Sequence, residues 1–142
     1  MSHASRAFQS VALGDELPER AIPLTTSLIV GGALASRDFT PVHHDPAAAR
    51  ATGMQDVFMN ILTTNGLVGR YVTDWAGIDA VVKELAVRLG TPNLPGDSMT
   101  LTGKVVARDE AGRSVDVEIV GRNAWGNHVT GRVKVALPAG AK

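Results

Sequence analysis

The last third of the sequence alternates apolar and polar residues, and this alternation strongly limits the folds open to the chain. In "SVDVEIVGRNAW", Val115, Val117 and Ile119 alternate with Asp116 and Glu118. Such a pattern is typical of antiparallel strands with one buried and one polar face. After the turn "GNH", a second stretch places four apolar residues and a glycine on one face: Val129, Gly131, Val133, Val135 and Leu137. We therefore expect meander strands whose apolar face needs a covering layer.

A long helix in the middle of the chain can supply that layer. The stretch "NILTTNGLVGRYVTDW", residues 60–75, is the best candidate. Gly66 and Gly69 lower its helix propensity by about 1 kcal/mol each relative to alanine. We expect a helix that keeps both glycines to meet another backbone closely, as when a sheet wraps around it. The apolar residues fall near one helical face, at Ile61, Val68, Val72 and Trp75.

The remaining segments complete an α+β fold. "LTTSLIVGGALA", Leu24 to Ala35, is rich in β-branched and apolar residues, and we expect it to be a buried strand. "DAVVKELAVRLG" is ambiguous between helix and strand, while "SMTLTGKVVARD" reads as a strand. We expect one strand before the central helix and about four after it, in a strongly curved antiparallel sheet. Residues 1–20 are expected to form a loosely held N-terminal segment, and residues 21–138 the single domain.

Composition excludes several classes of function. The 142 residues suffice for one domain. Lysine plus arginine equals aspartate plus glutamate at 14 each, so no basic surface indicates a nucleic-acid partner. There is no cysteine, which excludes disulfides and thiolate chemistry. No window approaches the roughly 18 apolar residues of a membrane helix and no signal peptide is evident, so we expect a cytoplasmic protein without membrane contact.

The stretch "RDFTPVHHD" carries the candidate chemistry. Asp38 and His43 lie five residues apart in a loop that contains a proline, so both side chains can converge on one point. Imidazole exchanges protons near neutral pH, and a nearby carboxylate can orient the ring or hold a water molecule. This pair suits the addition of water to a polarised double bond. Backbone N–H groups at Asn60 and Ile61, where the central helix begins, would stabilise the developing oxyanion by about 3 to 4 kcal/mol.

The residues around this pair have simpler interpretations. Asp45 precedes "PAAARATG" and is expected to cap a short helix that ends near Gly53. His44 is expected to be a solvated bystander. "HHD" lacks further ligands, so no metal site is expected.

The other two histidines and the paired arginines have no clear role. His128 is expected to lie exposed in a hairpin turn, and His3 falls in the N-terminal tail. The pairs Arg37/Arg70 and Arg88/Arg122 could be surface charges or could meet a phosphate.

The loop and the segments around it resemble a known family. "SRDFTPVHHDPAAARATG" is similar to the hydratase motif of MaoC-like enoyl-CoA hydratases, which have the hot-dog fold: a long central helix wrapped by a curved antiparallel sheet. Asp38 and His43 fall on that family's catalytic pair. "LPGDSMTLTGKV" is similar to its turn into a long strand, with the corner at residues 95–97. The resemblance covers residues 25 to 137.

Two further stretches resemble one branch of this family. "DVFMNILTTNGLVGRYVTDWAG" and "IVGRNAWGNHVTG" are similar to small subunits of actinobacterial hydratases that act on steroid side-chain enoyl-CoA thioesters. The resemblance implies a larger MaoC-like hot-dog partner subunit, in a heterodimer or heterotetramer that could be further joined to a thiolase-like aldolase. Met59-Asn60 stands where many family members have His-Gly, which changes the shape of the pocket but leaves a backbone donor.

The resemblance implies a hydratase for a trans-2-enoyl-CoA, with a steroid of the cholesterol type as acyl group. His43 would act as the base toward water, Asp38 would position that water, and the amides near Asn60 would polarise the thioester carbonyl. CoA belongs to the substrate, so no separate cofactor is expected. A homodimeric hydratase for fatty acyl-CoA and a non-catalytic hot-dog partner subunit stay open. Thioester hydrolysis is disfavoured because the central helix offers only the distal Asp74 as a carboxylate.

Overall fold

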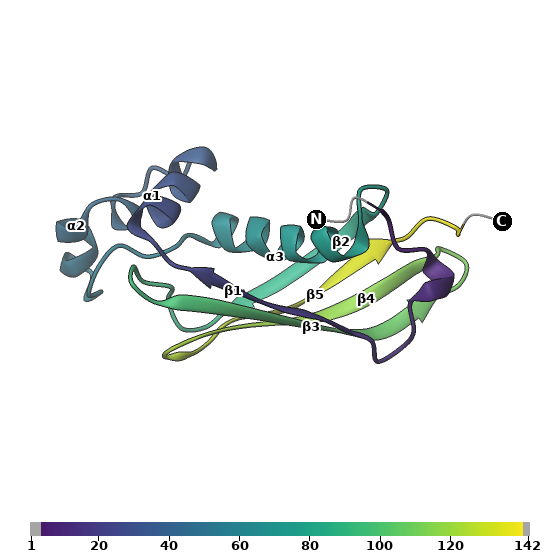
Figure 1. The fold of residues 1–142 in the computed structure, drawn as a ribbon. Helices are drawn as coiled ribbons and strands as arrows, with labels where there is room; N and C mark the ends of the chain where they lie inside the picture. Colours follow the sequence, from purple (N-terminus) through teal and green to yellow (C-terminus); the bar gives the residue numbers. More distant parts are fainter. Residues whose placement is uncertain (1–3, 141–142) are drawn as a thin grey trace.

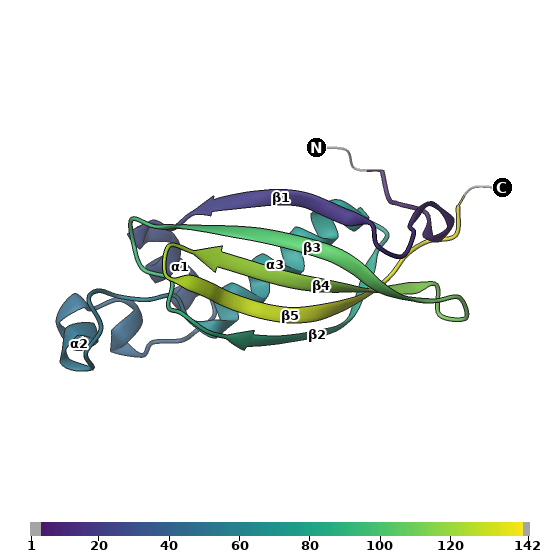
Figure 2. The same cartoon turned by 90° about the horizontal axis from the view of Figure 1, so that it is seen from below.

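The computed structural model describes residues 4–140, which form a five-stranded antiparallel sheet and three α-helices. The strand order across the sheet is β1-β3-β4-β5-β2, as Figure 2 shows. The strands are β1 (Glu16–Pro23), β2 (Val81–Leu89), β3 (Ser98–Asp109), β4 (Ser114–Asn123) and β5 (Gly126–Ala136). The helices are α1 (Thr26–Ala35), α2 (Pro46–Ala51) and α3 (Ile61–Ala76), with 3-10 turns at η1 (Phe8–Ser10) and η2 (Pro41–His43).

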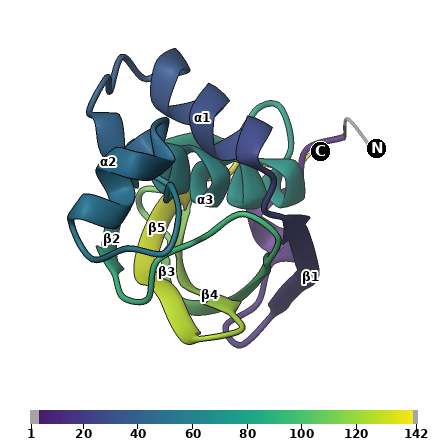
Figure 3. The same cartoon turned by 90° about the vertical axis from the view of Figure 1, so that its left-hand side faces the viewer.

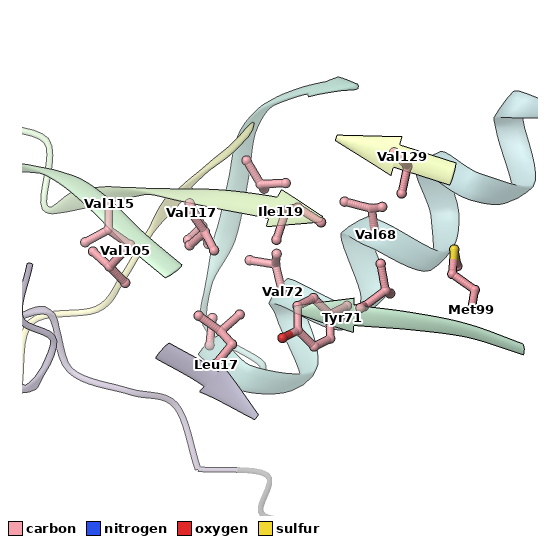
Figure 4. Close-up of a cluster of buried hydrophobic side chains, with 14 of the residues drawn as sticks. Leu17, Val68, Tyr71, Val72, Met99, Val105, Val115, Val117, Ile119 and Val129 are labelled. Carbon is pink, nitrogen blue, oxygen red and sulfur yellow. The ribbon is translucent and has the colours of Figure 1, made fainter. Parts of the chain in front are cut away.

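Helix α3 lies along the sheet, which curves around it, whereas α1 and α2 gather at one end of the molecule (Figures 1 and 3). The expected α+β architecture, with one strand before the central helix and four after it, is confirmed. The alternating residues of the last third point into the core as predicted. Figure 4 shows Val68 and Val72 of α3 among residues of the sheet, including Val117, Ile119 and Val129.

The glycines of α3 do not meet the close backbone contact that their presence led us to expect. A Cβ atom added at Gly66 would meet nothing within 4 Å, and one at Gly69 would meet only Leu85 Cδ1, at 3.6 Å. The sheet touches the opposite face of the helix, through Thr64, Val68 and neighbouring buried residues. The prediction is therefore wrong for this chain, and the space beside Gly66 is open.

The segment expected to be a buried strand is a helix. Thr25 caps α1 by accepting a hydrogen bond from the Leu28 N–H at 3.0 Å, which satisfies one of the free donors of the first turn. Gly32 lets α1 approach α3 closely, because a Cβ atom there would lie 2.2 Å from Thr63 Oγ1. Tertiary packing on α3 and the cap at Thr25 override the strand propensity of the β-branched residues.

The strand before the central helix is instead β1, which pairs with β3. The boundary expected between residues 20 and 21 therefore falls inside a strand. Phe8 and Val11, within the expected N-terminal segment, are buried in the core. The ambiguous segment that follows α3 is the strand β2, which lies at the opposite edge of the sheet from β1. Between residues 4 and 140, no helix is long and apolar enough to cross a membrane.

Candidate active site

The ring of His43 is held by the carbonyl group that precedes α3. His43 lies in η2 and is only 7% exposed, and its Nδ1 atom is 2.6 Å from the carbonyl oxygen of Phe58. A carbonyl oxygen can only accept, so Nδ1 carries the hydrogen and Nε2 of the neutral ring holds the free lone pair. The ring of Phe58 packs edge-on against the imidazole, with centroids 4.9 Å apart. Both contacts fix the direction in which Nε2 points.

The Asp38 carboxylate faces that lone pair. Its Oδ2 atom lies 3.3 Å from Nε2 of His43. The loop leaves α1 through Arg37, which adopts a positive φ of 58°, and the Asp38 N–H then donates to the Ala33 carbonyl at 2.9 Å. Two acceptor atoms at this separation can accept hydrogen bonds from the same water molecule, or share one proton. The structure thus brings together the two residues that the motif predicted to be catalytic.

Hydrogen bonds keep Asp38 ionised. The Thr40 side chain lowers the pKa of the Asp38 carboxyl most, followed by the Asn60 side chain and the Thr40 backbone N–H. These donors favour the charged form, and the neighbouring His43 acts in the same direction. The hydroxyl of Thr40 donates to Oδ1 at 2.7 Å, and Asn60 donates to Oδ2 at 3.0 Å. The carboxylate is therefore an acceptor throughout the neutral pH range.

Asn60 does more than the sequence led us to expect. It is 2% exposed, and its Oδ1 atom accepts from the Thr63 N–H at 3.0 Å, so it caps α3. Its Nδ2 group donates to Asp38 and, at 2.9 Å, to the hydroxyl of Ser36. From the sequence, only a backbone role is expected of Asn60, and Ser36 is not identified. The preference for asparagine at N-caps was the available signal for the first role, since Asn60 immediately precedes the predicted helix.

The start of α3 presents free donors next to this pair. Within the part of the chain that the structure describes, the backbone N–H groups of Asn60 and Ile61 meet no acceptor. The N-terminus of a 16-residue helix also carries a partial positive charge. The exposed apolar side chains of this region are Leu34, Phe39, Ile61 and Leu62. The helix end can thus stabilise an oxyanion and offer an apolar contact for a substrate.

Two of the other histidines, His44 and His128, differ in exposure. His44 is exposed, as expected. His128 lies in β5 rather than in the turn and is only 1% exposed. The expectation that it is exposed is therefore wrong. The connection from β2 to β3 covers this end of β5, where the Gly90 N–H donates to the His128 carbonyl and the Thr91 N–H to the Asn127 carbonyl. His3 lies outside the described residues.

The remaining predictions concern structural residues and metals. Asp45 caps α2 by accepting from the Ala47 and Ala48 N–H groups. Gly96, at the predicted corner before β3, has a positive φ of 91°. Among residues 4–140, no group of three or more histidine, aspartate or glutamate side chains could hold a metal ion.

A groove of about 830 Å³, lined in part by Arg20 and Trp75, lies toward the other end of α3, and neither Asp38 nor His43 lines it.

Comparison with known proteins gives a consistent result. The profile of the family described as "MaoC like domain" matches residues 9–124. The chain is 46% identical over 125 residues to the 3-oxo-4,17-pregnadiene-20-carboxyl-CoA hydratase beta subunit of Mycobacterium tuberculosis (strain ATCC 25618 / H37Rv). That alignment covers 88% of this chain and 95% of the relative.

Solved structures agree with this result. A chain of the ChsH1-ChsH2 complex from Mycobacterium tuberculosis superimposes with a TM-score of 0.86 and 46% identity, over 89% of this chain and 98% of that chain. The unliganded R-hydratase PhaJ1 from Pseudomonas aeruginosa also gives a TM-score of 0.86, over 96% of this chain and 88% of that one. At 18% identity, that second match shows a shared fold only.

Proposed function

The chain belongs to the MaoC like domain family and is a hydratase, and from this premise we propose that it is the catalytic small subunit of a heteromeric enoyl-CoA hydratase. The substrate would be a trans-2-enoyl-CoA thioester with a steroid side chain as acyl group. One observation carries the proposal: Nε2 of His43 and Oδ2 of Asp38 face each other at 3.3 Å. They do so beside the unpaired amides at the start of α3.

The geometry suits the addition of water. Nε2 of His43 takes one proton from water while Asp38 accepts a hydrogen bond from the second hydrogen, which stays on the oxygen. The water oxygen forms a bond to C3. The electrons of the double bond move toward the thioester oxygen, where the N–H groups of Asn60 and Ile61 stabilise the charge. The proton taken by the imidazole then returns to C2, which restores the carbonyl group. The net change is one water molecule added, without oxidation or reduction, so the reaction requires no cofactor beyond the CoA of the substrate.

The steroid substrate is supported by the relative at 46% identity, whose name specifies a pregnadiene carboxyl-CoA. The exposed apolar side chains at the site, such as Phe39 and Ile61, fit a bulky apolar acyl group. A single chain of this size is too small to enclose such a ligand together with α3. A second subunit would therefore complete the pocket.

A larger hot-dog subunit is the proposed partner, supported by the match to a chain of the ChsH1-ChsH2 complex. Strand β2 offers the edge for this contact, because among residues 4–140 it pairs only with β5. Its residues Val81 and Val82 are 51% and 38% exposed. The opposite edge, β1, carries Pro18 and Pro23, which disfavour pairing. A further link to a thiolase-like aldolase remains an expectation from the sequence resemblance.

Co-expression with the larger subunit tests the proposal. The complex should convert steroid enoyl-CoA thioesters to products heavier by one water, as measured by mass spectrometry. His43→Ala should lower kcat by about 10²- to 10⁴-fold, and Asp38→Asn should also lower it. The adjacent, exposed His44→Ala is the matched control and should keep full activity. Undiminished hydration by both site variants would instead identify a non-catalytic partner subunit, and a lone homodimer active on fatty enoyl-CoA would exclude the heteromeric assignment.

A further inference from the structure

His128 makes two hydrogen bonds in the interior of the protein, and the reaction described above uses neither of them. Its Nδ1 atom lies 2.7 Å from the Thr91 carbonyl oxygen, and its Nε2 atom lies 2.9 Å from Oγ1 of Thr64. The carbonyl only accepts, so Nδ1 must carry the hydrogen. Nε2 of the neutral ring is then an acceptor, and the hydroxyl of Thr64 donates to it. The environment thus determines both the tautomer of His128 and the direction of the Thr64 hydroxyl.

Thr64 connects this histidine to the start of α3. It is fully buried in the first turn of the helix, four residues after Asn60. Its Oγ1 atom is also 3.4 Å from the Asn60 carbonyl oxygen, but its single proton is directed to the closer Nε2 of His128. On the other side of the same turn, the Asn60 side chain donates to Asp38. A continuous path of hydrogen bonds and one helical turn therefore leads from β5 to the carboxylate that faces His43.

The same region holds the residue that precedes the helix. The Met59 N–H donates to the Asn93 carbonyl at 3.1 Å, and Asn93 is completely buried. The Nδ2 group of Asn123 donates to Oδ1 of Asn93 at 3.0 Å, and Thr91 Oγ1 donates to Oδ1 of Asn123 at the same distance. Segment 91–93 thus fixes the entrance to α3 on one side and anchors His128 on the other. The free amides at Asn60 and Ile61 lie between these two attachments.

Apolar packing alone does not explain a histidine at this position. Residues of β5 with similar burial are valines, including Val129 and Val133. A buried imidazole must find partners for both nitrogen atoms, whereas a valine would need none. The two bonds of His128 reach elements that are far apart in the sequence, the connection after β2 and the first turn of α3.

We infer that His128 is a positioning residue for hydration, which acts through Thr64 to set the first turn of α3. That turn carries both the amides that face the thioester oxygen and the Asn60 side chain that holds Asp38. The inference rests on the proposed function and deepens it. Loss of the Nε2–Thr64 bond should displace groups that act in the transition state, and should therefore lower kcat while KM changes little.

Two substitutions of His128 separate its two bonds. In His128→Gln, the side-chain oxygen reaches the position of Nε2 and can still accept from Thr64. In His128→Asn, the amide nitrogen takes the position of Nδ1 and bonds only to Thr91. We expect His128→Asn to lower kcat of the complex about 10-fold or more, with KM within about twofold, and His128→Gln to retain most of the activity. A purely structural role would destabilise both variants without this difference in kcat.

Thr64→Val removes the same bond from the other side while keeping the branched shape. It should reproduce the kcat loss of His128→Asn, and the double variant should show no further loss, because both changes break one interaction. Thr73→Val, near the other end of α3, is the matched control and should keep wild-type kinetics.

The outcomes separate the two proposals. A wild-type complex that hydrates no enoyl-CoA thioester would overturn the proposed function and, with it, this inference. An active wild-type complex with fully active Thr64→Val and His128→Asn variants would overturn the inference alone. Should His128→Asn fail to assemble, Thr64→Val still decides the question.

Discussion

Nδ2 of Asn60 donates a hydrogen bond to Oδ2 of Asp38 at 3.0 Å, while Oδ1 of the same side chain caps α3. One amide group therefore joins the start of the central helix to the carboxylate that faces His43. Because its donor and its acceptor have separate tasks, substitutions can distinguish the stability of the helix from the proposed chemistry.

Asn60→Ser should separate these tasks. Serine is about as good an N-cap as asparagine, so the unfolding temperature should change little. The donor to Asp38 is lost, and we expect kcat to fall about 10-fold, because the carboxylate is no longer held toward His43. Asn60→Ala loses the cap as well and should cost about 1 kcal/mol more in unfolding free energy. Steady-state kinetics and thermal melts measure both effects, and full kcat in Asn60→Ser would contradict the positioning role of Asn60.

Thr40→Val should raise the pKa of the Asp38 carboxyl. The hydrogen bond from the Thr40 side chain is the largest of the effects that hold the pKa of Asp38 below its ordinary value of 3.8. Without it the pKa rises, so Asp38 becomes protonated at a higher pH on acidification. The carboxyl resonance of Asp38, followed by NMR against pH, should titrate at a higher pH than in the wild type, while hydration at neutral pH persists. Thr40→Ser restores a hydroxyl and should return the titration of Asp38 toward its wild-type position. A titration unmoved in Thr40→Val would contradict the role of the Thr40 hydroxyl in lowering the pKa of Asp38.

The fold was predictable wherever the pattern of residues was local. The alternation from Val115 to Ile119 predicted β4, and the apolar face of residues 60–75 predicted α3 within one residue of its observed bounds. Leu24 to Ala35 was predicted wrongly, because its β-branched residues favour a strand until the contact of Gly32 with α3 is known. That contact joins segments about 30 residues apart, and no local pattern records it.

In the site, too, features set by local sequence were predictable, and features set by distant contacts were not. The spacing within one loop permitted Asp38 and His43 to converge, and the resemblance to the family motif identified them as a pair; the structure places them 3.3 Å apart. The side-chain role of Asn60 and the burial of His128 depend on contacts with distant segments. The local sequence pattern, a histidine after a glycine and an asparagine near a hairpin turn, predicts an exposed side chain. Only the connection after β2, which covers this end of β5, makes it part of the interior.

Two glycine substitutions should have opposite effects. Gly66→Ala places a methyl group in open space within a helix, so it should raise the unfolding free energy by about 0.5 to 1 kcal/mol. Gly32→Ala places the methyl group 2.2 Å from Oγ1 of Thr63, next to the cap of α3, and should destabilise the protein and lower activity. Chemical denaturation and hydration assays of both variants check this contrast. A destabilising Gly66→Ala in the assembled complex, beside a stabilising effect in the isolated chain, would show that a second subunit occupies the space.

His128 should make the stability of the protein depend on pH. Burial lowers the pKa of His128 below its ordinary value of 6.5, although the Thr91 carbonyl acts in the opposite direction. Below about pH 6.5 the unfolded chain binds a proton that the folded chain does not, so the unfolding free energy falls as the pH decreases, until the folded pKa is passed. Asp38, whose pKa lies below 3.8, stays ionised through this window. In thermal melts between about pH 8 and pH 5, the unfolding temperature of the wild type should therefore decrease as the pH decreases. The slope of unfolding temperature against pH should be smaller in His128→Gln and unchanged in His44→Ala. An equal slope in His128→Gln would mean that the buried imidazole is not the group that takes up the proton on unfolding.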